Sequence, residues 1–157
     1  MLLTNHVLTG TFLGLSIDNP AILFPAGVAS HLAMDMVPHF GFTYSIFADG
    51  RKGFQDLGFI IVGGLDFAVA TSVVIGFCLA RPDRAGHILI GALGAALPDL
   101  TYIPAIIFGE RVYRWFPWLK RLIFGFLAPI QWFEKPIGLM TEVVWLALIT
   151  TLLRYFT

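Results

Sequence analysis

Three ionisable residues recur at every fourth position of one apolar stretch, at His31, Asp35 and His39. Residues four apart on an α-helix lie on one face, one turn above the other. His31 and Asp35 are therefore predicted to point the same way, with His39 close by if the helix continues past Pro38. Ionisable side chains in a membrane are costly and usually face a protein interior, where they bind or react. We interpret these three residues as candidate ligands that form half of a metal site.

The composition predicts an integral membrane protein. The 157 residues are 57% hydrophobic and 13% charged, with a mean hydropathy of +0.81, whereas a soluble domain carries roughly 25% charged residues. The zero net charge argues against a nucleic-acid partner, and the single cysteine, Cys78, excludes an intrachain disulfide. We expect an all-α helical bundle, one transmembrane domain over residues 1–157, with membrane lipid as its partner.

Five stretches are apolar over the length that a spanning helix needs, about 17–25 residues. We expect spans at residues 2–17, 21–40, 54–80, 86–108 and 136–155. The sequences Asp18-Asn19-Pro20 and Arg81-Pro82-Asp83-Arg84 join successive spans so tightly that the helices must run antiparallel. Segment 110–135 mixes basic residues with tryptophans, which is typical of the headgroup layer. One or two interfacial helices are predicted there, although an aromatic belt on a connecting loop explains the same pattern.

The basic residues divide unequally between the two sides of this predicted bundle. Seven lie on the side of the N-terminus: Arg51, Lys52, Arg111, Arg114, Lys120, Arg121 and Lys135. Three lie on the other side: Arg81, Arg84 and Arg154. An excess of basic residues marks the cytoplasmic side. The N-terminus is therefore predicted to be cytoplasmic, in a plasma membrane or bacterial inner membrane.

The other predicted spans also carry ionisable groups, which lie at the middle of the membrane or on its cytoplasmic side. They are therefore predicted to lie near the depth of His31, Asp35 and His39. They are His6, Asp66, Asp99 and Glu142. Taken singly, each has a structural explanation, such as backbone capping, helix bridging or a local turn after Pro98. Taken together, several carboxylates crowded in a low dielectric need a cation or protons to persist. Imidazole and carboxylate ligands suit zinc, or less selectively manganese or iron.

A metal site near the lipid boundary predicts a hydrolase. A catalytic zinc keeps one position open for water and lowers the pKa of that water to about 7. Metal-activated water would then attack an ester or phosphoester of a lipid or other amphiphile, with Glu142 or Asp66 as general base. Two other classes stay open. One is a proton- or cation-coupled transport or channel subunit, which needs a homo-oligomer. The other is a non-enzymatic scaffold whose polar groups only specify helix packing.

Three short motifs resemble those of the bacterial membrane-bound metal-dependent hydrolases related to zinc-dependent phospholipase C. They are an early histidine, a Gly-rich helix ending in Pro-Asp and a helical His-x3-Asp pair, which here are His6, Leu97-Pro98-Asp99 and His31-x3-Asp35. The resemblance covers the first four predicted spans. It implies that four of these residues are the metal ligands, namely His6, His31, Asp35 and Asp99.

Overall fold

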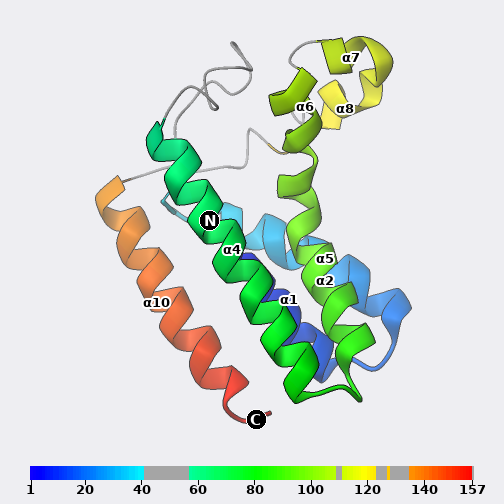
Figure 1. Ribbon diagram of the computed structural model, residues 1–157, viewed down its shortest axis with the longest axis vertical. Coiled ribbons are helices and arrows are strands. Elements are labelled where there is room, and N and C mark those ends of the chain that lie inside the picture. The colour runs from blue at the N-terminus through cyan, green and yellow to red at the C-terminus, as the bar shows by residue number, and fades with distance from the viewer. Residues whose placement is uncertain (41–56, 109–110, 123–126, 128–134, 157) are drawn as a thin grey trace.

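The described residues of the protein form an all-α fold. A computed structural model describes residues 1–40, 57–108, 111–122, 127 and 135–156, and these ranges contain helices and no extended strand. In chain order the helices are α1 (Leu3–Ser16), α2 (Pro20–Asp35), α4 (Leu57–Ala80), α5 (Ala85–Leu100), α6 (Tyr102–Phe108), α7 (Arg111–Trp115), α8 (Pro117–Leu122) and α10 (Lys135–Leu153). The predicted helical class is confirmed (Figure 1). Residues 41–53, which lie between the second and third predicted spans, are outside the described residues.

Both predicted short turns form, and they meet at one end of the bundle. At the start of α2, the Asn19 side chain accepts a hydrogen bond of 2.9 Å from the Ala21 N–H, and Pro20 occupies the first helical position, where its missing N–H costs nothing. Arg84, at the start of α5, donates to Asp18 across 2.5 Å. This guanidinium holds the pKa of the Asp18 carboxyl below its ordinary value of 3.8, because it stabilises the charged form.

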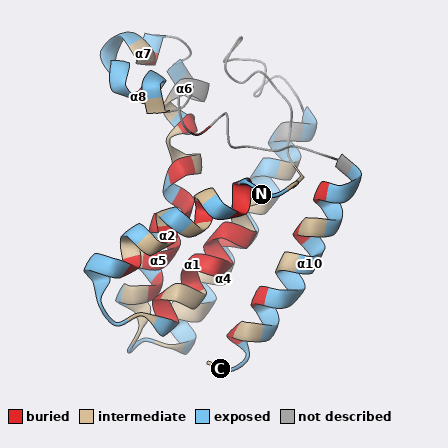
Figure 2. Cartoon of the chain, turned by 180° about the vertical axis from the view of Figure 1, so that it is seen from behind, coloured by how far each residue is buried: buried red, intermediate tan, exposed pale blue. Residues whose placement is uncertain are grey.

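Helix α1 is the interior element of the bundle. It packs mainly against α5 and also contacts α2, α4 and α10, while α2 packs against α5. Figure 2 shows the buried residues gathered on α1 and α5, with α10 largely exposed. The close approach of α1 to α5 depends on Gly10 and Gly91, since a Cβ at either position would collide with the backbone of the other helix. Small residues at a helix interface allow this separation.

Three helical stretches are long and apolar enough to cross a membrane, at Ile60–Ala80, Ala85–Pro104 and Pro136–Leu153. Five spans were predicted. The other two predicted spans are helices α1, of 14 residues, and α2, of 16 residues, which at 1.5 Å per residue fall short of a hydrocarbon core about 30 Å thick. Helix α1 instead buries Asn5, Thr9 and Thr11 among its neighbours, so its length need not match that of a lipid-facing helix.

The chain bends where α5 ends. Thr101 terminates α5, and its hydroxyl donates to the Pro98 carbonyl across 2.6 Å. Helices α7 and α8 then form within the predicted interfacial segment 110–135. They pack on Tyr102 through Val112 and Leu119, in a small cluster that also holds Leu127. Residues 110, 123–126 and 128–134 of that segment lie outside the described residues, and its place at a membrane interface stays a prediction.

Candidate metal centre

Helix α2 brings His31 and Asp35 together as their four-residue spacing predicts. His31 Nε2 lies 3.2 Å from Asp35 Oδ2, and both side chains are buried. The helix ends at Asp35, so the expected continuation to His39 does not occur. The chain nevertheless turns at Met36, and His39 Nε2 comes to 3.7 Å from Asp35 Oδ1. Asp35 is therefore flanked by two imidazoles from its own segment.

Helix α1 adds a third imidazole. His6 Nε2 lies 3.3 Å from Asp35 Oδ1, and the His6 ring stacks on that of His31 with centroids 3.8 Å apart and planes inclined by 20°. His6 has no exposed surface. His6 and His31, which are 25 positions apart in the chain, thus come into contact because α1 and α2 both pack against α5.

Helix α5 supplies the second carboxylate of the cluster. Asp99 Oδ1 lies 3.8 Å from His31 Nε2. One ligand atom from each of His6, His31 and Asp99 can be chosen so that all three lie within 4.8 Å of one another. The Asp99 side chain is 32% exposed, against 1% for His31, so the cluster is open on the Asp99 side and closed elsewhere.

Backbone carbonyls fix the tautomers of two of the histidines. His31 Nδ1 lies 2.7 Å from the Ala95 carbonyl oxygen, and His39 Nδ1 lies 2.8 Å from that of Val37. A carbonyl oxygen only accepts hydrogen bonds, so each Nδ1 carries the hydrogen, and in the neutral ring each Nε2 presents a lone pair that a metal can bind. This arrangement, in which the second ring nitrogen donates to a carbonyl, is the usual support of a metal-binding histidine.

The cluster has the spacing of a metal coordination shell. Ligand atoms bound tetrahedrally at about 2.0–2.1 Å from one zinc ion are ~3.3 Å apart. The distances from Asp35 to the Nε2 atoms of His6 and His31 are 3.3 and 3.2 Å. Nδ1 of the buried His6 has no hydrogen-bond partner among the described residues, although buried polar atoms are normally paired, and Nε2 of His6 lies 3.3 Å from Asp35. A divalent cation would bind this Nε2 atom and offset the charge of both carboxylates.

The positively charged N-terminus lies against the same Asp35 carboxylate. The amino group of Met1 donates to Asp35 Oδ1 across 2.6 Å, and both groups are almost fully buried. Asp35 is thus contacted from α1, from its own helix and from the start of the chain. The structure therefore makes this residue the centre of the cluster, a position that sequence spacing alone does not distinguish from that of Asp99.

The predicted general bases, Asp66 and Glu142, lie at the first turn of α1. Asp66 accepts hydrogen bonds from the backbone N–H groups of Leu3 and Thr4 at 2.7 and 3.0 Å. Glu142 accepts from the Leu2 N–H at 3.1 Å and from the Asn5 side chain at 2.6 Å. Their general-base role stays a prediction.

Sequence reasoning missed three participants in this region. Thr4 and Asn5 bind the two carboxylates, and the polar run Thr4-Asn5-His6 in an otherwise apolar segment is the signal that identifies them. The third is the Ala95 carbonyl that orients His31. Every residue carries such a carbonyl, so no sequence pattern marks this one.

Comparisons with known proteins add no assignment to this geometry. No protein-family description, no curated protein and no solved structure matches the chain. The donor set of imidazole nitrogens and carboxylate oxygens is compatible with zinc, manganese and iron.

Proposed function

We propose that the protein is an integral membrane hydrolase that binds a divalent metal, zinc, through His6, His31, Asp35 and Asp99. The single observation that supports this proposal most is the convergence of two buried imidazoles with the carboxylates of Asp35 and Asp99, from three helices, at 3.2–3.8 Å. A shared cation would bind the imidazole nitrogens and offset the charge of the two crowded carboxylates.

The exposure of Asp99 supports access of water and substrate to the ion. Four protein ligands fill a tetrahedral shell, so water would bind an ion held here as a fifth ligand or in place of one carboxylate. The side chains of His6 and His31 are buried, whereas the Asp99 side chain is 32% exposed. An ion held by these residues would supply Lewis-acid activation of water and of a substrate oxygen. The chain itself would orient the His31 ring through the Ala95 carbonyl and admit substrate past Asp99.

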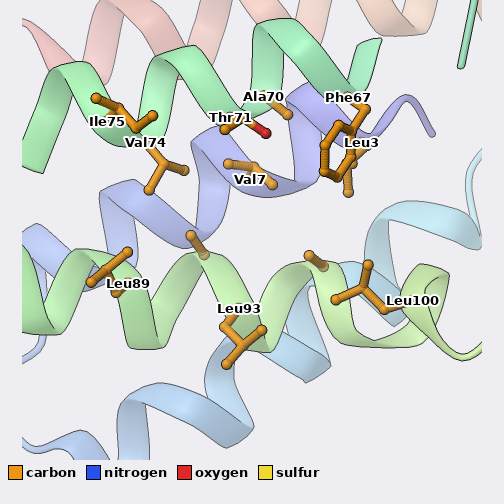
Figure 3. Close-up of a pocket in the computed structure, with 12 residues that line it drawn as sticks. Leu3, Val7, Phe67, Ala70, Thr71, Val74, Ile75, Leu89, Leu93 and Leu100 are labelled. Carbon is orange, nitrogen blue, oxygen red and sulfur yellow. The ribbon is translucent and has the colours of Figure 1, made fainter. Parts of the chain in front are cut away.

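An apolar groove supports an amphiphile as the substrate. It has a volume of about 310 Å³, is formed by α1, α4 and α5, and is lined by apolar residues except for Thr71. Figure 3 shows Leu3, Phe67 and Leu100 at one end, and Ile75 and Leu89 at the other. Leu100 follows Asp99 directly in the chain. An alkyl chain in this groove would bring an adjacent ester or phosphoester towards the open side of the metal site.

Metal content of the purified protein tests the binding part of the proposal. After dialysis against zinc and removal of excess ion, we expect about one zinc per chain. The variants His31→Ala and Asp35→Asn each remove a ligand and should retain little zinc. His87→Ala and Asp18→Asn are matched controls, because these residues interact with each other at the turn end of the bundle and should leave the zinc content unchanged. A wild-type protein without bound zinc would contradict the proposal.

Hydrolysis is tested separately with a fluorogenic ester and a fluorogenic phosphodiester, each carrying a long alkyl chain and presented in detergent micelles. The zinc-loaded protein should cleave one of them, chelation should abolish the reaction, and added zinc should restore it. His31→Ala should be inactive under conditions in which His87→Ala is fully active. A zinc-loaded protein that cleaves neither probe would leave metal binding intact and overturn the proposed reaction.

A further inference from the structure

The first turn of α1 is held by carboxylates from two other helices. A helix begins with backbone N–H groups that have no partner within the helix, and these are usually capped by the side chain just before it. Leu2 occupies that position and offers no side-chain cap. Asp66 of α4 and Glu142 of α10 accept the hydrogen bonds instead, from Leu2, Leu3 and Thr4.

The same two carboxylates also bind side chains of this turn. The Thr4 hydroxyl donates to Asp66 Oδ1 across 2.6 Å, and the Asn5 amide donates to Glu142 Oε2 across 2.6 Å. Both oxygens of each carboxylate are therefore used. Negative charge at a helix N-terminus is favourable because it faces the positive end of the helix dipole. Glu142 makes these contacts in a buried position.

This turn leads directly into His6. The His31 ring is oriented by the Ala95 carbonyl on Nδ1, whereas Nδ1 of His6 has no hydrogen-bond partner among the described residues. Its place is set by stacking on His31 and by the position of the α1 backbone. A small displacement of the first turn would move Nε2 of His6 away from Asp35.

We infer that Asp66 and Glu142 are positioning residues that hold the start of α1 so that His6 reaches the metal. A metal-binding histidine is normally oriented by a hydrogen-bond partner on its second ring nitrogen. For His6, the two carboxylates do this indirectly, because they fix the backbone turn that leads into this residue. This inference rests on the proposed metal site and assigns these carboxylates a task other than proton transfer. Helices α4 and α10, which contribute no ligand, thereby become necessary for the geometry of the site.

Cobalt binding to purified variants tests the inference, because cobalt occupies zinc sites and its visible absorption depends on coordination geometry. Asp66→Asn replaces one acceptor oxygen by an amide that cannot accept, so one N–H of the first turn loses its partner. Glu142→Gln does the same. Each should weaken cobalt binding by about 10- to 100-fold, as loss of an outer partner does, and should change the absorption spectrum. Asp83→Asn, on the exposed turn at the opposite end, is the matched control.

Thr4→Val gives a second measurement, which stays informative if the carboxylate variants fold poorly. It keeps the backbone hydrogen bond to Asp66 and removes only that from the hydroxyl. We expect a smaller loss of cobalt affinity, up to about tenfold, with the same direction of spectral change. If wild type binds cobalt and Asp66→Asn, Glu142→Gln and Thr4→Val all keep its affinity and spectrum, the inference is wrong and the metal site stands. If wild type itself binds no cobalt, the proposed function fails instead.

Discussion

The inner helices α1, α2 and α5 and the outer helices α4 and α10 are packed in opposite ways. Between the inner helices, a Cβ at Gly10, Gly27 or Gly91 would collide with the backbone of a neighbouring helix. On α4, a Cβ at Gly63 or at Gly76 would meet nothing within 4 Å. The same residue type is thus a packing requirement in one region and an exposed position in the other.

The exposed surface of the outer helices follows from this difference. Leu65 and Leu79 of α4 are 63% and 77% exposed, and Met140 of α10 is 68% exposed, whereas Ile88 of α5 is completely buried. Large apolar side chains at such exposure suit a lipid environment. The four proposed metal ligands all come from the inner helices, so the proposed site is built on the tightly packed part of the molecule. The outer helices add only the carboxylates that hold α1.

The largest difference between the two regions is expected for side-chain truncation. Ile88→Ala leaves a cavity among α1, α5 and α10 and should lower the free energy of unfolding by about 2–5 kcal/mol. Leu65→Ala, on the exposed face of α4, should change it by less than about 0.5 kcal/mol. Reversible unfolding in mixed micelles measures both values. Equal effects would show that the inner helices are no better packed than the outer ones.

Glycine substitution tests the close approach of the inner helices. Gly91→Ala introduces a Cβ against the backbone of Gly10 and should cost about 1–3 kcal/mol, as overpacking does. Gly76→Ala is the matched control in a helix with open space around it, and it should be neutral or slightly stabilising because alanine favours helix. A Gly91→Ala protein as stable as Gly76→Ala would contradict the proposed contact.

The attachment of α10 to α1 is expected to be weaker. The Trp145 indole donates to the Thr9 hydroxyl across 3.0 Å. Trp145→Phe removes this hydrogen bond and should lower the free energy of unfolding by about 1 kcal/mol. Trp118→Phe, at a site that is 60% exposed, serves as control and should have no measurable effect. A loss as large as that of Ile88→Ala would contradict the small contribution expected of this single hydrogen bond.

The smallest effect is expected at the turn end, where Asp18 pairs with Arg84. Because the pKa of Asp18 is lowered in the folded state, its contribution to stability is present above the ordinary value of 3.8 and is lost as the pH falls through the lower folded value. The difference in melting temperature between wild type and Asp18→Asn should therefore shrink below pH 3.8. A difference that is constant from neutral pH to pH 2 would exclude this ion pair as its cause.

The sequence allows the helix positions to be predicted because its turns are strongly marked. Asp18-Asn19-Pro20 and Pro82-Asp83 interrupt the apolar segments, and the observed helices begin and end beside them. The pairing of His31 with Asp35 follows from helical geometry alone. What hydropathy does not reveal is which helix lies inside, because α1 is buried by neighbours that are distant in the chain.

The roles of Asp66 and Glu142 were beyond sequence reasoning for a related reason. Their partners are mainly backbone N–H groups of α1, and every residue except proline carries such a group. Intramembrane carboxylates predict a polar partner but not which one. His39 was predicted through a continuing helix, and the structure brings it beside Asp35 by a turn instead. The orientation of the N-terminus towards the cytoplasm stays a prediction.

X-ray absorption at the zinc edge of the zinc-loaded protein tests the central claim most directly, because it reports the ligands around the ion itself. The four proposed ligands predict a shell of nitrogen and oxygen atoms at about 2.0–2.2 Å with the scattering of two imidazoles. His31→Ala should lose zinc or show one imidazole fewer. A protein that retains no zinc, or whose zinc has no imidazole ligand, would contradict the claim that α1, α2 and α5 together build a metal site.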